Sequence, residues 1–386
     1  MKKDLARLKS LVGKKKRSVL NRILKFFSMI DTPCYLVGGV VRDALLNRIS
    51  PDIDIMVVGD AIELAQRLSK ELNSPLKIYR DFNTASIEYK DKRIDLASSR
   101  REYYPAPARL PIVKPGTLFE DLKRRDFSIN AIALGISKNN LGEVVDPFNG
   151  IQDIKRRLIR ILHQNSFIDD PTRIFRALRY KNRLGFRLEK ETAILMKEAI
   201  SQGMIQRLSG QRILNELRLI FSESPFYRTV LDLNKYRIYK IKKGAIRFLL
   251  KAGPWRFYYY LALIDCDKFP LSREEKKIIN DLRGLKIKVF QLKKAKKNSE
   301  VYYLLSSLAE EVIEIIPALY PELNSKVRLY KSLRKVKPLI KGGDLKKLGI
   351  KSGPNFKHLL YKAFAEQIDL GIKDKEELIN RIKSGQ

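Results

Sequence analysis

The chain has 386 residues, of which 44% are hydrophobic, so it is long enough for several packed modules and can bury a sizeable core. Its 78 Lys and Arg outnumber its 43 Asp and Glu, and the net charge of +35 favours a polyanionic partner such as nucleic acid or an anionic membrane. The chain has only two cysteines and two histidines, which are too few for a disulfide framework or a zinc site. Any metal must therefore be held by carboxylates.

The N-terminal segment MKKDLARLKSLVGKKKRSVL lacks the apolar core of a signal peptide. No apolar run approaches the roughly 20 residues that a membrane span requires. The sequence therefore predicts a cytoplasmic protein with no membrane partner.

The first module extends from about Ser18 to Gly135 and alternates short β-rich runs with helical patterns. Helices are predicted around 19–30, 40–46 and 61–72, and strands at 35–37, 53–58, 86–89 and 93–97. This order predicts a small mixed β-sheet. The segment Tyr103–Gly116 contains four prolines and predicts an extended surface loop.

From about Asp146 onward the pattern is helical. Helices are predicted around 211–221, 245–250, 256–263, 273–282 and 300–315. The fold class is therefore α+β, with a mixed-sheet head followed by an all-helical neck, body and tail. We place the head at 1–140, the neck at 141–225, the body at 226–290 and the tail at 291–386.

Two acids, Asp52 and Asp54, lie two residues apart in a predicted strand and would project from the same face. Adjacent carboxylates repel unless a cation lies between them, and an oxygen-only site suits Mg²⁺. Asp95, in RIDLASS, is a third acid in a strand-like run. The alternative is that these acids cap turns or face solvent on an edge strand.

A glycine pair, Gly38 and Gly39, follows the first predicted strand and precedes a helix. Such a turn lets backbone N–H groups approach a phosphate, and Arg42 on the first helical turn could reach the same anion. With the two-acid strand, these residues predict a site for a triphosphate and its metals.

Five stretches carry a family resemblance: LVGGVVRDALLNRISPDIDI, RIDLASSRREYY, EDLKRRDFSINAIAL, DPFNGIQDIKRRLIRIL and FIDDPTRIFRALRYKNRLGF, in order over about 34–186. Together they resemble the class II tRNA nucleotidyltransferase and bacterial poly(A) polymerase family, within the DNA polymerase β-like nucleotidyltransferase superfamily. The resemblance implies that Asp52 and Asp54 bind two Mg²⁺ ions and that Gly39 and Arg42 contact the triphosphate. Asp95 would be the third superfamily carboxylate, beside the metal that activates the attacking 3′-hydroxyl.

The stretch RRDFSIN resembles the family motif that contacts the sugar and phosphates of the incoming nucleotide. The resemblance implies that Arg125 reaches phosphate. Asp126 and Asn130, four apart on one expected helical face, would meet ribose hydroxyls. The alternative is a solvated basic turn before a core helix.

In the family's fourth motif, an acid and an arginine three residues apart pair with the Watson–Crick edge of the nucleotide. Asp170 and Arg173 match them. A carboxylate only accepts and a guanidinium only donates, so the pair would take cytosine or adenine and reject uracil or guanine. Arg176 and Arg179 are expected at the triphosphate or the primer end. The alternative is a solvated basic stripe, with Asp170 as a helix cap.

The helical remainder carries lysine clusters at 292–298 and 330–351, with aromatic residues between them. A basic face of this kind can follow an RNA backbone, and the tail is therefore predicted to bind tRNA by its shape. The alternative, a lysine-rich surface adapted to heat, does not explain so large an excess of positive charge.

The sequence thus predicts Mg²⁺-dependent, template-independent addition of nucleotides from CTP or ATP to the 3′ end of tRNA. The step could be CCA, CC only or A only. The proline-rich segment lacks an acid-plus-Arg loop, which favours a partial-CCA enzyme. The alternatives are a poly(A) polymerase on general RNA, a small-molecule nucleotidyltransferase and a non-catalytic RNA-binding protein.

Overall fold

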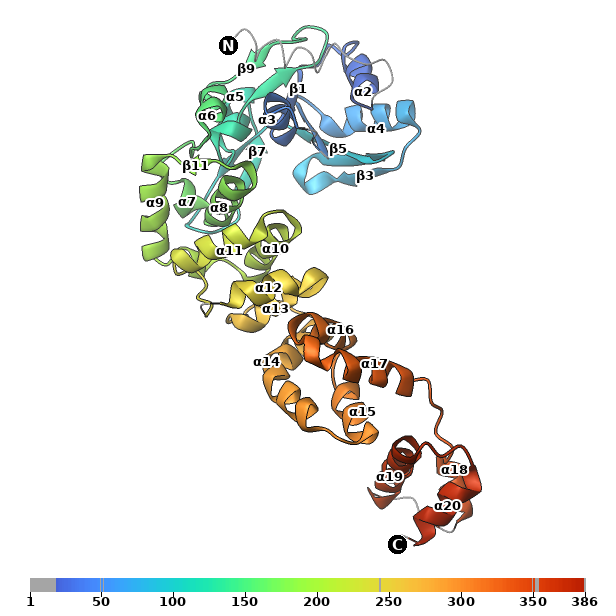
Figure 1. Ribbon diagram of the computed structural model, residues 1–386. Helices are drawn as coiled ribbons and strands as arrows, with labels where there is room; N and C mark the ends of the chain where they lie inside the picture. The colour runs from blue at the N-terminus through green and yellow to red at the C-terminus, as the bar shows by residue number, and fades with distance from the viewer. Residues whose placement is uncertain are drawn as a thin grey trace. The chain divides into compact units, whose positions relative to one another are not determined.

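The structure is a computed structural model that describes residues 19–384 except 49, 51, 243, 349 and 351–353 (Figure 1). The chain forms two compact units, the first ending at Ile238 and the second beginning at Tyr239. Within the described ranges, no helix combines the length and the apolar character needed to cross a membrane.

The first unit is built on a seven-stranded mixed sheet in which β2 and β5 are parallel and the other neighbouring pairs are antiparallel. All four residues of β1 are buried, whereas β2 alternates at its start because one face of it borders a cleft. The strands in spatial order are β3 (Leu76–Tyr79), β4 (Thr84–Tyr89), β5 (Lys92–Ser98), β2 (Asp52–Val57), β1 (Cys34–Val37), β8 (Ala133–Gly135) and β9 (Val144–Val145).

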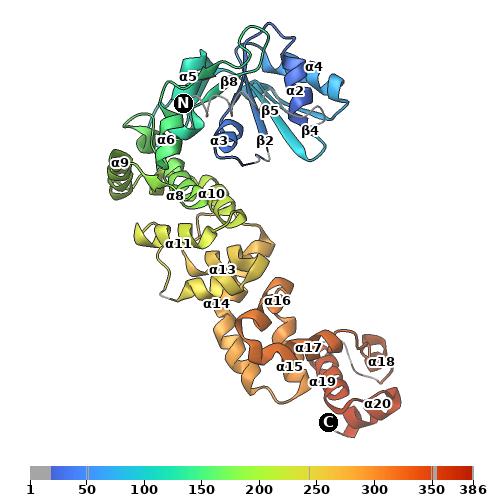
Figure 2. The same cartoon turned by 45° about the horizontal axis from the view of Figure 1, so that its top comes forward.

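Helices α2 (Val19–Phe27) and α4 (Ala61–Leu72) lie side by side along the sheet (Figures 1 and 2). The Asp60 carboxylate caps α4 by accepting from two backbone N–H groups, and left-handed Asn73 ends it. The apolar face of α4 is buried against β4 and β5. Helix α3 (Gly39–Leu45) joins β1 to β2 directly beside the glycine turn.

After the sheet, the first unit becomes helical. The central helix is α8 (Thr172–Leu184), which packs against α10 and α11 and buries two of its arginines, Arg173 and Arg179, together with its apolar residues. Two short strands, β10 (Leu158–Ile159) and β11 (Arg187–Leu188), form a parallel pair. The helices are α5 (Leu118–Lys123), α6 (Gly150–Arg156), α7 (Ser166–Asp169), α8 (Thr172–Leu184), α9 (Lys190–Ser201), α10 (Gly210–Ser222) and α11 (Phe226–Lys235).

The described part of the second unit is helical. Its larger core gathers leucines and isoleucines of α14, α15 and α16, and a smaller core forms around Leu345 and Leu378. Its helices are α12 (Ala245–Lys251), α13 (Arg256–Leu263), α14 (Arg273–Lys294), α15 (Asn298–Ser306), α16 (Glu310–Leu319), α17 (Asn324–Leu333), α18 (Gly342–Lys347), α19 (Pro354–Leu370) and α20 (Lys375–Ser384).

The predicted α+β class is confirmed, and three local predictions are wrong. The helix expected over 300–315 is two helices, α15 and α16, separated at 307–309. The residues 126–130 form only a 3₁₀ turn, Ser128–Asn130, rather than a helix. The proline-rich segment is not a simple surface loop, because its ends pair as the antiparallel strands β6 (Arg100–Tyr103) and β7 (Ile112–Pro115). The two-unit division leaves the four-part division from the sequence as a prediction.

Candidate active site

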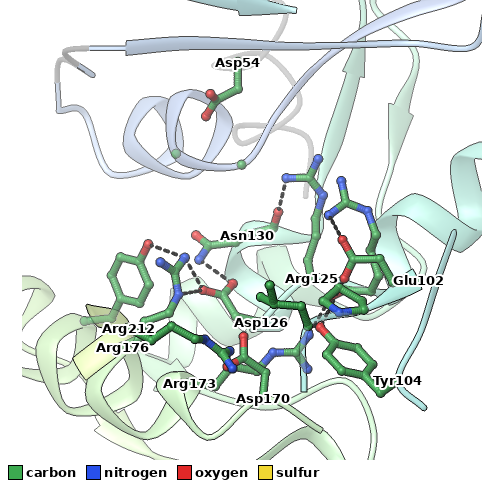
Figure 3. Close-up of a pocket in the computed structure, with 16 residues that line it drawn as sticks. Asp54, Glu102, Tyr104, Arg125, Asp126, Asn130, Asp170, Arg173, Arg176 and Arg212 are labelled. Carbon is green, nitrogen blue, oxygen red and sulfur yellow. Dashed lines mark hydrogen bonds and ion pairs between the residues drawn. The ribbon is translucent and has the colours of Figure 1, made fainter. Parts of the chain in front are cut away.

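A cleft of about 400 Å³ lies in the first unit, between the sheet and the helices that follow it (Figure 3). Asp54 lies on one side of this cleft, and Asp170 and Arg173 lie on the other. The lining residues are Gly38, Gly39, Asp54, Glu102, Tyr104, Leu110, Pro111, Arg124, Arg125, Asp126, Asn130, Asp170, Arg173, Arg176, Tyr180 and Arg212.

The parallel pairing of β2 and β5 sets the acids of the strand side. Asp54 is directly opposite Asp95, and Asp52 is opposite Arg93. Burial raises the pKa of Asp54, Arg125 lowers it, and the neighbouring charges of Asp95 and Asp52 raise it again, with a net increase. A half-buried carboxylate surrounded by like charge is stabilised by a cation.

Asp95 is already engaged by the protein. Its Oδ1 accepts from Arg93 Nε at 2.9 Å and from the Ser86 hydroxyl. Among the residues that the structure describes, no three His, Cys, Asp or Glu side chains converge closely enough to hold a metal ion. Two carboxylates still fit Mg²⁺, which is usually bound through one or two carboxylates together with water and substrate phosphate.

The turn before α3 requires glycine at position 38. Gly38 has φ +70°, and a Cβ there would lie 3.2 Å from Arg125 Nη1 and 3.4 Å from Asp54 Oδ2. A side chain would therefore crowd both groups. Asp121 fixes the side chain of Arg125, because its Oδ2 accepts a hydrogen bond from Arg125 Nη2 at 2.9 Å.

Asp121 is a residue that the sequence analysis missed, and only 1% of it is exposed. Burial alone would raise the pKa of this acid, but Arg125 and Arg124 lower it below its ordinary value. Arg124 donates to Asp121 Oδ1 from Nη2 at 2.7 Å and to Glu102 Oε1 from Nη1 at 3.0 Å. Asp121 thus fixes both arginines of the RRD motif, and its position three residues before Arg124 was the available signal.

Arg42 does not line the cleft. The side chain is 3% exposed and donates to Asp43 Oδ1 at 2.8 Å and to Asn130 Oδ1 at 2.6 Å. Asn130 in turn donates from Nδ2 to Asp126 Oδ1 at 2.9 Å. In this arrangement Arg42 orients Asn130, and its contact with a triphosphate stays a prediction.

Asp126 is held on both carboxylate oxygens. Oδ1 accepts from Asn130 and from the Phe127 N–H, and Oδ2 accepts from Arg176 Nε at 2.9 Å. Burial would raise the pKa of Asp126, but Arg176 and the Asn130 hydrogen bond outweigh it and lower the pKa to about 2. Arg179 lies away from the cleft lining, paired with Glu223, so its predicted role at the primer or phosphate stays untested.

Asp170 and Arg173 lie together in the cleft, as the sequence predicts, although their contact with a base stays a prediction. Asp170 precedes Pro171 and α8, and its Oδ1 accepts from the Thr172 N–H at 3.0 Å. Arg173 is 3% exposed, donating from Nη1 to Ser166 Oγ at 2.7 Å and from Nη2 to the Arg124 carbonyl at 2.7 Å. The arginine is therefore anchored before any ligand arrives.

Three further cleft or near-cleft residues were missed. Arg212 of α10 donates to Asp170 Oδ1 at 2.6 Å, and nothing in its local sequence marks it. His163 is the second missed residue. Its pKa is lowered to about 4 by burial and by the charges of Arg173 and Lys123, so the imidazole stays neutral beside Arg173.

Tyr180 is the third missed residue. Its ring lies 5.2 Å from the guanidinium carbon of Arg42, 5.6 Å from Arg176, 4.8 Å from Arg179 and 4.9 Å from Arg183. This cation–π cluster joins α3 to α8. The spacing of Tyr180 four residues after Arg176 was the available signal.

The chain is similar to known proteins in sequence and in fold. The family profile described as "Poly A polymerase head domain" matches residues 34–160, and the one described as "Probable RNA and SrmB- binding site of polymerase A" matches residues 185–242. An A-adding tRNA nucleotidyltransferase of Aquifex aeolicus (strain VF5) is 36% identical over 90% of this chain. The chain spans 45% of that relative's length.

An A-adding tRNA nucleotidyltransferase of Halalkalibacterium halodurans is 29% identical over 94% of this chain and 90% of its own length. A solved structure of a CCA-adding enzyme in an apo form is 31% identical, with a TM-score of 0.80 and 99% of each chain covered. Sequence and fold are therefore similar over almost the whole chain. The chain belongs to the class II tRNA nucleotidyltransferase and bacterial poly(A) polymerase family.

Proposed function

We propose that this protein transfers nucleotides from a nucleoside triphosphate to the 3′ end of tRNA without a template. The observation that carries the proposal is one cleft with Asp54 and the Gly38 turn on one side and the Asp170 and Arg173 pair on the other. The first side suits a triphosphate with its cation, and the second suits a base edge. The cleft is therefore built to take a whole nucleotide.

Enzymes of this family generally use divalent metal ions. We propose that Asp52 and Asp54 hold Mg²⁺ here, with Asp95 beside them on the next strand. Bound Mg²⁺ supplies charge neutralisation for the triphosphate and lowers the pKa of the attacking hydroxyl. Arg125 adds a fixed positive charge next to the Gly38 turn, where the phosphates would lie, and Asp121 prevents it from swinging away.

The choice of base rests on Asp170 and Arg173 in this proposal. Cytosine and adenine offer an amine donor beside an unprotonated ring nitrogen, which matches one acceptor and one donor. Uracil and guanine reverse the pattern and would leave a carboxylate facing a carbonyl, which costs roughly 1–3 kcal/mol or more. Arg176 and Asp126, tied to each other, form the adjoining wall of the cleft.

We further propose that the step catalysed is the addition of the terminal A. The two named relatives that match over 90% and 94% of this chain are A-adding enzymes, although this chain spans only 45% of the first one's length. Addition of the full CCA end is the second candidate, because the similar solved structure is named a CCA-adding enzyme. We place the activity in the cytoplasm, where the two buried, unpaired cysteines fit a reducing compartment.

The second unit would grip the RNA, with the body and tail predicted from the sequence as its parts. A hollow of about 420 Å³ between α15 and α19 is lined by aromatic rings and by Lys341 and Lys357. Tyr361 is 48% exposed there, and Lys357 Nζ lies 5.9 Å from its ring centroid. A ring face beside lysines suits an unstacked base and its phosphate.

The test uses three tRNA transcripts that end before CCA, after the first C and after CC. Each is incubated with Mg²⁺ and one nucleoside triphosphate at a time. We expect a single AMP on the transcript ending in CC and little UMP or GMP on any transcript. CMP on the two shorter transcripts together with AMP on the transcript ending in CC would instead establish full CCA addition, and CMP without AMP would establish addition of CC only.

An unstructured RNA of matched length is the control substrate. Long adenylate ladders on this RNA would favour the poly(A) polymerase alternative. UMP and GMP incorporated as readily as AMP and CMP would contradict base reading by Asp170 and Arg173.

A further inference from the structure

Arg212, near the start of α10, bridges two segments that are distant in the sequence. Its Nη2 donates to Asp170 Oδ1 at 2.6 Å, and its Nη1 donates to the Ala108 carbonyl at 2.8 Å. The side chain is 21% exposed, and its backbone N–H is capped by the Ser209 hydroxyl. Because both Nη atoms are used, the guanidinium plane is fixed.

The hydrogen bonds on Asp170 are distributed unequally between its oxygens. Oδ1 accepts from Arg212 Nη2, from the Thr172 N–H at 3.0 Å and from Thr172 Oγ1 at 2.5 Å. Every hydrogen bond that this carboxylate accepts from the described residues ends on Oδ1. Oδ2 therefore keeps its lone pairs for a ligand in the cleft.

The second nitrogen, Nη1 of Arg212, is bonded to the turn between β6 and β7. Ala108 is 7% exposed with φ +61°, and its N–H donates to the Ile168 carbonyl at 3.1 Å. Leu110 and Pro111, just after it, line the cleft. The turn is thus hydrogen-bonded to Ile168, two residues before Asp170. Arg212 links this turn to Asp170.

We propose that Arg212 is a positioning residue that sets base selectivity by holding Asp170 so that only Oδ2 is presented to the incoming base. The proposal rests on the proposed function, because it assumes that Asp170 reads the nucleotide. Arg212 acts through Asp170 and not on the reacting atoms. A carboxylate fixed on one oxygen cannot rotate to relieve a mismatched carbonyl, so the fixed state carries the full penalty against uracil and guanine.

The main variant is Arg212→Gln, which removes the charge and the two-armed bridge. We expect the ratio of kcat/KM for ATP over GTP to fall about tenfold or more, because the freed carboxylate can turn away from a carbonyl. The kcat at saturating ATP should fall by a smaller factor than this ratio, because the phosphate side of the cleft is untouched. A purely structural role would lower kcat and leave this ratio unchanged.

Two conservative variants separate the contributions of the individual hydrogen bonds. Arg212→Lys keeps one cationic donor for Asp170 but cannot reach Ala108 at the same time, so it should restore most of the ATP preference. Thr172→Val removes the hydroxyl donor to Oδ1 and keeps the N–H, and it should lower the preference by a smaller factor in the same direction. The double variant with Arg212→Gln should show less than the product of the two factors, because both donors act on one oxygen.

Arg207→Gln, an exposed arginine just before α10, is the matched control and should keep the wild-type ratio. The second readout is equilibrium binding of ATP and of GTP without RNA, which needs no turnover. Loss of the ATP preference in Arg212→Gln but not in Arg207→Gln would support the proposal. A folded Arg212→Gln protein with the wild-type ratio in both assays would overturn it.

If Arg212→Gln does not fold, Thr172→Val becomes the test variant, and an unchanged ratio of kcat/KM for ATP over GTP in that variant would overturn the proposal. A wild-type protein that adds no nucleotide to any tRNA transcript would contradict the proposed function. In that case, the ratio of the affinities for ATP and GTP would still test the role of Arg212. The two failures are therefore distinguishable.

Discussion

On the strand side of the cleft, Asp54 lies opposite Asp95, and burial together with this like charge raises the pKa of Asp54 more than Arg125 lowers it. On the helix side, Asp126 is paired with Arg176, and its pKa is lowered to about 2. Asp121, beneath that side, is paired with Arg124 and Arg125. The protein thus pairs Asp126 and Asp121 with its own arginines and leaves the charge of Asp54 only partly balanced.

In the function that we propose, this difference separates a carboxylate that binds a cation from carboxylates that stabilise the fold. A buried acid with its own arginine stabilises the folded state and is unavailable to an external cation. An acid kept among like charges costs stability until a cation binds. Substitutions on the two sides of the cleft test this division.

Asp54→Asn should lower kcat for nucleotide addition by about 10³-fold or more, because several kcal/mol of charge stabilisation would be lost. The free energy of unfolding should stay equal or rise, since the variant removes a repelled, half-buried charge. Single-turnover incorporation and urea unfolding measure the two effects. Asp91→Asn, an exposed acid in the turn before β5, is the control. Full activity in Asp54→Asn would refute the strand-side assignment.

Asp121→Asn should lower the free energy of unfolding by about 3–4 kcal/mol, because the largely buried Arg125 loses its charged partner and Arg124 keeps only Glu102. Urea unfolding at neutral pH checks this loss. Selectivity for ATP should also weaken in the protein that remains folded, since the Arg124 carbonyl anchors Arg173. Wild-type stability in this variant would show that the helix-side pairs contribute little.

The His163 pKa of about 4 lies below the ordinary value of 6.5 for a histidine, so the unfolded chain takes up its proton first as the pH falls. Its contribution to stability is complete above about pH 6.5 and is lost as the pH falls towards 4. We expect a loss of roughly 2–3 kcal/mol over this window in the wild type. His163→Gln should flatten the slope, as measured by urea unfolding at several pH values. Identical slopes in both proteins would contradict a neutral His163.

Mg²⁺ at ten times its dissociation constant should raise the free energy of unfolding of the wild-type protein by roughly 1.4 kcal/mol. The gain should vanish in Asp54→Asn and persist in Asp91→Asn. Thermal unfolding with Mg²⁺, and with EDTA as the metal-free reference, measures it. An equal gain in Asp54→Asn would place the cation elsewhere.

Local patterns could be predicted wherever near neighbours in the sequence decide the structure. Helix α4 was predicted with the bounds that the structure gives it, because Asp60 caps its start and its apolar face repeats every turn. The two-residue spacing of Asp52 and Asp54 fixed their shared face before any pairing was known. Asp170 and Arg173 belong to one helix start, so their proximity also followed from the sequence.

Only the tertiary structure decided the partners of charges that lie far apart in the sequence. Arg42 is bound to Asn130, 88 residues away, and Arg212 to Asp170, 42 residues away. The strands β6 and β7 pair across a proline-rich segment whose composition suggested only a loop. Composition and spacing set which side chains share a strand or helix face. The path of the chain brings distant elements together, and that path sets which arginine neutralises which acid and which acid is left for a ligand.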